Sequence, residues 1–408
     1  MSLRILLAAI VCLGLFPKPG RGQEAPHYKV DAYWPQELPY NWILGQVDGL
    51  AVDSEDHIWV LHDPRGVPRD DAGAAQMPPW THCCIPAPAV LELDRAGKVL
   101  RAWGGADRIP VWPAGPHGIA VDRKGDVWIG GVGSPWNPDL PEPLGPGAER
   151  SRDRQVLKFS ADGKLLLEIG QPSAAPENNQ DTTLAGSPTG IAIDDAAHEV
   201  YIADGFLNKR IVVFDSETGA FKRGWGAYGI PLEAIDNSEP SAAELPTGHP
   251  RDASVSPPRQ FYTVASIAVS DDGLVYAADP KNDRIQVFTR QGKFRKEFFV
   301  APKTLGPGSV WGIALSRDPG QKYLLAADGA SGVVRILDRS TGRELEDLGS
   351  KGRNAGLFEN VGWVAVDSHQ VLYTGEVHFN RSWDGWQATH TGKTDTPGGR
   401  LQRFVPET

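Results

Sequence analysis

Cysteine is almost absent from this sequence: three cysteines occur in 408 residues, at positions 12, 83 and 84. So few cysteines cannot build a disulfide framework, and we expect the fold to depend on its apolar core. Cys83 and Cys84 are neighbours, and Cα atoms joined by a trans peptide lie only about 3.8 Å apart, closer than is usual for a disulfide. A vicinal disulfide and two free thiols both remain open. A metal site at His82, Cys83 and Cys84 is disfavoured, because no other cysteine or suitably spaced histidine accompanies them.

The sequence also lacks basic clusters and, beyond its first residues, long hydrophobic runs. The formal net charge is −10 with an isoelectric point near 5.5, which disfavours nucleic acids and anionic membranes as partners. After the N-terminal segment no apolar run approaches the roughly 18 residues of a membrane span. Residues 1–22 contain Arg4, an apolar run over residues 5–16 and then Pro17 to Gly22, the pattern of a signal peptide. We therefore expect an exported protein, periplasmic or secreted, without a membrane span.

Familiar catalytic signatures are missing as well. The chain contains no GxSxG, HExxH, P-loop or EF-hand pattern, so no nucleophile, metalloprotease, nucleotide or EF-hand site is indicated. The 46 glycines and 34 prolines imply many turns, whereas a hydrophobic content of 40% is enough for a packed core.

What the sequence does contain is one unit repeated six times. A glycine or another first residue is followed by an aliphatic residue, an alanine, a second aliphatic residue and Asp or Ser. The copies begin at Gly49 (GLAVD), Gly118 (GIAVD), Gly190 (GIAID), Ser266 (SIAVS), Gly312 (GIALS) and Trp363 (WVAVD). Each copy continues through a tight turn into a second and a third strand-like run, and five copies add a fourth. Four-stranded units repeated six times predict an all-β, six-bladed β-propeller that occupies residues 23–408 as one domain.

The sixth copy lacks a fourth strand, since only Pro406 to Thr408 follow its third run, RLQRFV. The strand-like run YKVDAYW, residues 28–34, has no other partner. We predict that it pairs with RLQRFV and closes the last blade, which removes an exposed sheet edge. The repeated alanine fits a first strand close to the axis, where only a small side chain has room.

The connections predict which face carries function. Long loops occur only after second or fourth strands, at residues 64–88, 133–152, 171–187, 229–263 and 379–399, and all of them fall on one rim. Loops on a rigid scaffold usually carry binding sites. The residues that precede each first strand's small residue should ring an axial mouth on this face: Asp48, His117, Thr189, Ala265, Trp311 and Gly362. The second-strand ends add further ligand-face candidates: Asp63, Arg65, Asp204, Phe206, Glu376 and His378.

Some of these candidates have a plainer interpretation. Asp204, Asp279 and Asp328 occupy one repeat position, which favours a structural role in capping backbone amides. His62 and His378 are equally explained as histidines satisfied by the fold or by water. His117 has no histidine at the other five equivalent positions, so it is the stronger functional candidate.

Segments such as PTGIAIDDAAHEVYIADGFLNKRIVVFD and DGLVYAADPKNDRIQVF resemble NHL repeats, and their order is similar to that of the peptidyl-hydroxyglycine amidating lyases. The resemblance implies a catalytic zinc held by three histidines that precede first strands. PHGIAVD places His117 at the first of these positions. The other two positions are Ala265 and Gly362, neither of which can bind a metal.

The remaining positions of that family are also altered. The resemblance places a catalytic tyrosine at Phe206 and a catalytic arginine at Pro280. The family has a further arginine at the position that is Asp63 here, and Arg65, two residues further on, is a candidate substitute. The side-chain ligand of a structural calcium falls at Trp363.

These features favour an exported NHL-type propeller that binds a small molecule, peptide or protein on its long-loop face and has diverged from the amidating lyases in its chemistry. The alternative is a diverged metal-dependent lyase or hydrolase with a rebuilt zinc or calcium site, in which His117 acts with Asp48, Asp63 or Glu376. A calcium-dependent lactonase is the form of that alternative that would use oxygen ligands around the axis. No catalytic residue is assigned from the sequence.

Overall fold

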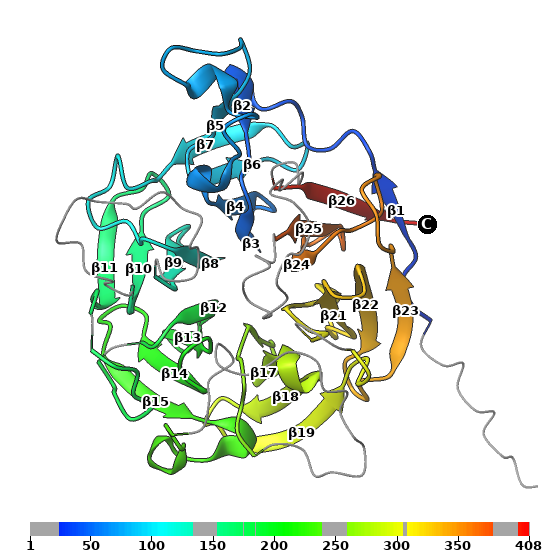
Figure 1. The fold of residues 1–408 in the computed structure, drawn as a ribbon. Coiled ribbons are helices and arrows are strands. Elements are labelled where there is room, and N and C mark those ends of the chain that lie inside the picture. Colours follow the sequence, from blue (N-terminus) through cyan, green and yellow to red (C-terminus); the bar gives the residue numbers. More distant parts are fainter. Residues whose placement is uncertain are drawn as a thin grey trace, which may run out of the picture.

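The computed structural model describes residues 24–133, 153–238, 259–377 and 399–407, apart from 174, 184 and 305–307. The expected signal peptide and His378 lie outside the described residues. Six four-stranded antiparallel sheets stand around a common axis, as Figure 1 shows. The predicted all-β, six-bladed propeller is confirmed, and the helices among the described residues are short 3₁₀ turns. None of the helices in the described ranges is long and apolar enough to cross a membrane.

The blades follow the chain order, and each runs from an inner to an outer strand. Blade 1 contains β3 (Val47–Val52), β4 (Ile58–His62), β6 (Val90–Leu93) and β7 (Val99–Trp103), and blade 2 contains β8 (Pro116–Val121), β9 (Val127–Gly131), β10 (Gln155–Phe159) and β11 (Leu165–Gly170). Blade 3 contains β12 (Pro188–Asp194), β13 (Glu199–Asp204), β14 (Arg210–Asp215) and β15 (Phe221–Trp225), and blade 4 contains β16 (Ser266–Val269), β17 (Leu274–Asp279), β18 (Arg284–Thr289) and β19 (Phe294–Phe299). Blade 5 contains β20 (Gly312–Leu315), β21 (Tyr323–Asp328), β22 (Val333–Asp338) and β23 (Glu344–Leu348). Blade 6 contains β24 (Val361–Val366), β25 (Leu372–Glu376), β26 (Leu401–Pro406) and β1 (Tyr28–Asp31).

The ring closes as the sequence predicts, because β1 is the outer strand of blade 6. It pairs antiparallel with β26, with Tyr28 opposite Pro406 and Asp31 opposite Arg403. The Asp31 carboxylate accepts a hydrogen bond from the Arg403 guanidinium, which adds an ion pair to the ladder. Strands from the two ends of the chain thus share one sheet, and the edge that β26 would expose is covered.

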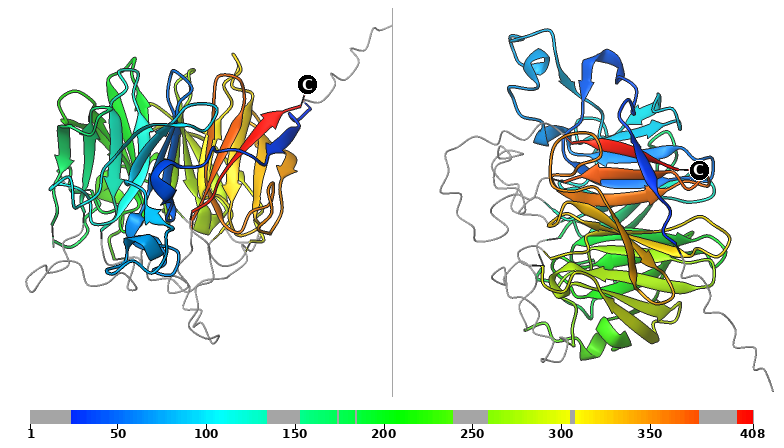
Figure 2. Two further views of the ribbon diagram at one scale, coloured as in Figure 1. Left: turned by 90° about the horizontal axis from the view of Figure 1, so that it is seen from above. Right: turned by 90° about the vertical axis from the view of Figure 1, so that its right-hand side faces the viewer.

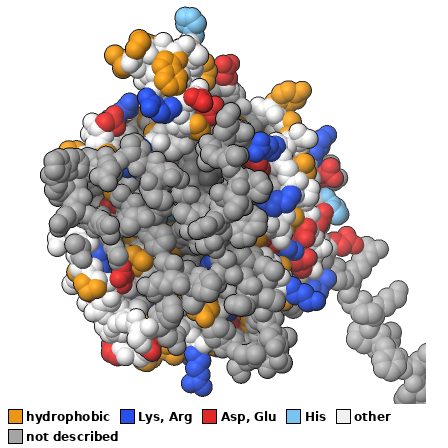
Figure 3. All heavy atoms as spheres, in the orientation of Figure 1, with side chains coloured by type: hydrophobic (Ala, Val, Ile, Leu, Met, Phe, Trp, Pro, Cys, Tyr) orange, Lys and Arg blue, Asp and Glu red, His pale blue; other side chains and the backbone are white. Residues whose placement is uncertain are grey.

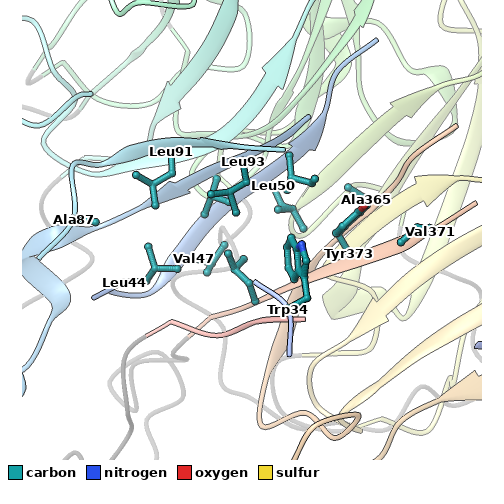
Figure 4. Close-up of a cluster of buried hydrophobic side chains, with 13 residues drawn as sticks. Trp34, Leu44, Val47, Leu50, Ala87, Leu91, Leu93, Ala365, Val371 and Tyr373 are labelled. Carbon is teal, nitrogen blue, oxygen red and sulfur yellow. The ribbon is translucent and has the colours of Figure 1, made fainter. Parts of the chain in front are cut away.

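Hydrophobic side chains hold the ring together between the blades rather than at one central core. Six buried clusters are present, one at each interface between neighbouring blades. The repeated alanines contribute one methyl group to each cluster: Ala51, Ala120, Ala192, Ala268, Ala314 and Ala365. Figure 4 shows the cluster at the closing interface, where the Trp34 ring packs 5.2 Å from that of Tyr373. The alanine is small because the inner strands of neighbouring blades converge there.

The glycines that begin several copies of the repeat are also explained by close contact between neighbouring blades. Inner strands of neighbouring blades contact one another around the whole ring, including β24 with β3. A Cβ atom on Gly312 would lie 2.3 Å from the Gly362 carbonyl oxygen, and one on Gly118 would lie 2.9 Å from the Thr189 carbonyl oxygen. Gly118 also has a φ of +76°, which a side chain would disfavour. At these positions the backbone of the next blade fills the space of a side chain.

One feature was not predicted from the sequence. Residues 64–88, the connection between β4 and β6, form a lobe that projects from blade 1 (Figure 1). The lobe contains the 3₁₀ turns η2 (Pro64–Gly66) and η3 (Gly73–Ala75), and its strand β5 (Ile85–Pro86) pairs in parallel with β2 (Trp42–Ile43). In the left view of Figure 2 the lobe lies on the rim opposite the hairpin turns, which is the rim predicted for the long loops.

Candidate functional site

Four aromatic rings from four blades meet at the axial mouth. His117 lies on β8, Phe206 follows β13, Trp311 precedes β20 and Trp363 lies on β24. The ring centroid of His117 lies 5.2 Å from that of Trp363 and 5.4 Å from that of Phe206, and the Phe206 centroid lies 6.5 Å from that of Trp311. These residues are called the aromatic cluster below.

Two of these contacts cross the axis of the propeller. His117 belongs to blade 2 and Trp363 to blade 6, and blade 1 stands between them. Phe206 of blade 3 and Trp311 of blade 5 are likewise separated by blade 4. Side chains of non-adjacent blades meet only across the centre of the ring, so the aromatic cluster occupies the axial mouth. Phe206 is buried, whereas His117, Trp311 and Trp363 are each partly accessible.

The local contacts of His117 determine its protonation. Its Nδ1 lies 2.9 Å from the Thr189 carbonyl oxygen, which only accepts hydrogen bonds, so Nδ1 carries the proton and donates it. Burial lowers the pKa of His117 to about 4, while the contact with Thr189 acts in the opposite direction. The imidazole is therefore neutral at pH 7, and Nε2 presents a lone pair.

Asp48, Asp63 and Arg65 form a separate polar group at the blade 1 side of the mouth. Asp48 is buried, and this burial, together with the Asp63 carboxylate, raises its pKa well above the ordinary value. The Gln46 amide donates a hydrogen bond to Asp48 and opposes that rise. Asp63 accepts bonds from the backbone amide and Nε of Arg65, both at 2.9 Å, and Arg65 also donates to the Ala114 carbonyl oxygen. Asp63 and Arg65 therefore join the base of the lobe to blade 2.

The acidic residues at the second-strand ends are bonded within the scaffold. Asp204 accepts hydrogen bonds from the amides of Gly186 and Ser187, at 2.7 and 2.8 Å, and pairs with Arg210 Nε at 2.8 Å. Glu376 repeats the arrangement in blade 6. Its Oε2 accepts from the Glu359 amide at 2.8 Å, and its Oε1 accepts from Arg400 Nε at 2.6 Å. We call this arrangement, in which a second-strand acid holds both the loop amides and an arginine in or just before the third strand, the strand-end clamp.

In blades 4 and 5 the second-strand acid also pairs with an arginine of its own blade, and in blade 4 Asp279 caps loop amides as well. Asp279 accepts from the Thr263 amide at 3.2 Å and pairs with Arg284 Nε at 2.9 Å. Asp328 pairs with Arg335 through Nη2 at 2.8 Å. These contacts give the repeated acids the structural role that their recurrence favours, and they leave Asp204 and Glu376 engaged by the fold.

Blades 1 and 2 reach the same result with other residues. At the end of β4, His62 accepts a hydrogen bond from the Gly45 amide at Nδ1 and lies 3.0 Å from the Pro88 carbonyl oxygen at Nε2. Both nitrogens are satisfied only in the neutral form, and burial lowers the pKa of His62 to about 4. In blade 2 the β9 end is Gly131, and Asp153 accepts instead from the Gly115 and Gly133 amides. Sequence reasoning missed Asp153 because it precedes the third strand.

The positions that the resemblance assigns to zinc do not fit that metal in the described residues. A catalytic zinc needs about three protein ligands, and Ala265 and Gly362 have no donor atom. A Cβ on Gly362 would lie 2.7 Å from Val377 Cγ1, so a histidine there would have to displace Val377. The rings around His117 are those of Phe206 and Trp363, which carry no lone-pair ligand. The Trp363 indole also replaces the oxygen ligand that a calcium ion would require.

Within the described residues, three potential ligands converge at a different place, on the opposite rim. Asp53, His57 and Glu92 have donor atoms within 4.8 Å of one another. Asp53 already accepts from Trp59 Nε1 at 2.9 Å and from the His57 amide at 2.9 Å. Glu92 bonds to His57 Nδ1 at 2.8 Å and to the Arg101 guanidinium. These contacts explain the group as a turn cap in blade 1.

Sequence reasoning identified His117, Phe206 and Trp311 at the mouth, but it named Trp363 only as a lost calcium position. The available signal was the repeat itself, because the sixth copy begins with tryptophan where the other copies have glycine or serine. At this position the next inner strand leaves no room for a large ring. The Trp363 ring turns toward the axis instead and meets His117 there.

Comparisons with known proteins find relatives in sequence but no matching family model. Peptidyl-glycine alpha-amidating monooxygenase B of Xenopus laevis is 26% identical over 378 residues, which are 88% of this chain and 35% of that protein. The probable peptidyl-alpha-hydroxyglycine alpha-amidating lyase of Caenorhabditis elegans is 24% identical over 254 residues, which are 60% of this chain and 56% of that protein. Among solved structures, U3-55K aligns with a TM-score of 0.45 and 13% identity over 86% of this chain and 79% of that one.

The chain spans about a third of the length of the amidating monooxygenases that it matches. The aligned part covers 88% of this chain, which is mostly propeller. The protein is thus a six-bladed β-propeller whose homologues, at about a quarter sequence identity, are peptidylglycine amidating monooxygenases and lyases.

Proposed function

We propose that this protein is an exported propeller that binds a small-molecule, peptide or protein ligand at the axial mouth of its long-loop face. In this proposal the chain has diverged from the amidating lyases in its chemistry. The observation that carries the proposal is the aromatic cluster. Phe206 and Trp363, at positions where the resemblance expects a catalytic tyrosine and a calcium ligand, stand at the mouth with His117 and Trp311.

The chemistry of the cluster suits an apolar group that carries one hydrogen-bond donor. Aromatic rings provide large contact areas with little loss of conformational entropy, which is why they dominate binding sites. The neutral His117 ring offers the Nε2 lone pair as an acceptor. Thr189, at the next position of the mouth, is occupied by its own bonds, since its Oγ1 donates to the Ala203 carbonyl oxygen at 2.9 Å.

A peptide that ends in α-hydroxyglycine is the first probe, because the names of the relatives identify that class of compound as their substrate. We expect saturable binding by isothermal titration calorimetry and no release of peptide amide. Trp363→Ala should weaken binding at least tenfold, which corresponds to about 1.4 kcal/mol. Trp80→Ala is the matched control, because Trp80 lies on the lobe and is 55% exposed. Absence of saturable binding by the folded wild-type protein would contradict the peptide form of the proposal.

The alternative, a rebuilt metal-dependent lyase or hydrolase, is separated by elemental analysis of the same preparations. The binding proposal expects no stoichiometric zinc or calcium that depends on His117. Stoichiometric metal in the wild type that is lost in His117→Ala, together with metal-dependent release of the amide, would establish the alternative and reject the binding proposal.

A further inference from the structure

We propose that Cys83 and Cys84 form a thiol-exchange site that reacts with dithiols and controls the conformation of the lobe. The two cysteines are joined by a disulfide bond. They lie directly before β5, near the C-terminal end of the segment 64–88 that forms the lobe on blade 1 (Figure 1). Cys83 is exposed and Cys84 is half-buried. This site is separate from the aromatic cluster and does not depend on the function proposed for it.

The bond contributes little to holding the propeller together. A disulfide stabilises a fold mainly by restricting the unfolded chain, and this effect is smallest when the closed loop is shortest. A bridge between adjacent residues closes the shortest loop that a chain allows. The six buried clusters hold the blades together, and among the described residues none of their members is a cysteine. A bond with so small a structural role is better explained by its reactivity.

The surroundings of the pair favour that reactivity. An external thiolate needs access to one sulfur, and exposed disulfides are the labile ones. The lobe also exposes apolar side chains, with Met77 92%, Trp80 55% and Ile85 40% accessible. In Figure 3 hydrophobic side chains gather at the top of the view, over the lobe. A protein or small-molecule dithiol can therefore approach Cys83 over an apolar surface.

The dithiol supplies all the electrons that the reduction of the disulfide requires. One thiolate of the dithiol attacks Sγ of Cys83, the bond between the cysteines breaks, and Cys84 leaves as a thiolate that takes a proton from water. The second thiol of the reagent then attacks the mixed disulfide and releases the Cys83 thiol. The protein disulfide is reduced to two thiols, and the dithiol is oxidised to its own disulfide.

Opening the bond would release contacts that shape the lobe. The Cys84 amide donates to the Asp71 carbonyl oxygen at 3.2 Å, and Thr81 Oγ1 donates to the Cys83 carbonyl oxygen. The Trp80 amide donates to the Gly73 carbonyl oxygen at 2.9 Å. These bonds fold the lobe back on itself beside the disulfide. Trp80, whose ring lies 5.6 Å from the Arg69 guanidinium carbon, therefore serves as a local reporter.

The test uses the full chain with Cys12→Ser, so that labelled thiols come only from the pair. Before treatment we expect no thiol that reacts with Ellman's reagent in the folded protein. After dithiothreitol, and its removal without oxygen, we expect two reactive thiols per chain and a change in Trp fluorescence that Trp80→Phe abolishes. The midpoint of thermal unfolding should stay unchanged, as it should in Cys83→Ser with Cys84→Ser.

Three results would overturn the proposal. A pair that reacts only after unfolding in guanidinium would show that the bond is inaccessible in the fold. Two reactive thiols in the air-equilibrated protein before any reduction would show that no bond forms. A clear fall in the unfolding midpoint on reduction would assign the bond to structure instead.

Discussion

The strand-end clamps and the aromatic cluster lie on the same face of the propeller, yet they differ in how far they repeat. The clamp recurs around the ring with the same task, as in the pairs Asp204 with Arg210 and Asp279 with Arg284. The aromatic cluster draws its rings from four blades and from repeat positions that differ between those blades. The first region anchors the bases of the loops, and the second does not follow the repeat.

This difference separates structural carboxylates from candidate binding residues on this face. An acid at the end of a second strand looks like a ligand or a catalytic group when it is considered alone. In the structure the partners of Asp204 and Glu376 are amides and arginines of their own blade. The scaffold charge recurs in blades 3 to 6 because each of these blades fixes a loop at the same strand end, whereas a binding group has no reason to repeat. The comparison therefore places the candidate site at the residues that break the repeat.

The largest expected effect comes from breaking one clamp. Arg284 is fully buried and pairs with the fully buried Asp279 at 2.9 Å. Arg284→Ala leaves that carboxylate without its cation, and we expect the free energy of unfolding to fall by about 3–5 kcal/mol. Urea titration followed by circular dichroism measures the change.

The matched control for this variant is Lys124→Ala. Lys124 pairs with Glu217 at 2.8 Å, but both side chains are exposed, so a loss below about 1 kcal/mol is expected. Equal losses in the two variants would remove the distinction between a buried clamp and a surface ion pair.

A smaller effect depends on pH and concerns blade 1, where His62 takes the clamp position. Its pKa is about 4 in the folded protein, below the 6.5 of an ordinary histidine, so the unfolded chain binds more protons between these values. Stability that depends on His62 is therefore complete above pH 6.5 and lost toward pH 4. The rate of loss is at most about 1.4 kcal/mol per pH unit.

His62→Gln isolates this contribution. Asp48, whose pKa is raised by burial, changes stability with pH in the opposite direction, but it is present in both proteins. The gap in unfolding free energy between wild type and variant should be widest at pH 7 and should narrow as the pH falls from 6.5 to 4.5. A gap that does not change over this range would show that His62 is not held neutral by the fold.

The smallest expected change in stability belongs to the aromatic cluster. Trp311 is partly accessible, and Trp311→Phe keeps an aromatic ring next to Phe206, so the free energy of unfolding should fall by less than about 1.5 kcal/mol. The same variant should weaken binding of the hydroxyglycine peptide severalfold, measured by calorimetry. A large loss of stability without a change in binding would assign the cluster to the scaffold and erase the difference between the two regions.

Much of the architecture was predictable because it depends on local patterns that repeat. Six copies of one motif predict six blades, and a strand-like run at residues 28–34 with no partner predicts the closing strand β1. His117 stood out because it differs from its five equivalents. The parallel pairing of β2 with β5 was not predictable, since two-residue strands leave no periodic pattern.

The number of blades and the closure of the ring follow from the sequence alone, because alternation, turn residues and repeat spacing act over short stretches of chain. Only the tertiary structure decided that Asp204 and Glu376 are held by arginines, and that His117 and Trp363 meet across the axis. The arginine pairs depend on how the loops of one blade fold back onto the strand ends, and the contact of His117 with Trp363 depends on how the ring closes. The function proposed for the mouth therefore rests on a distance that no single repeat contains.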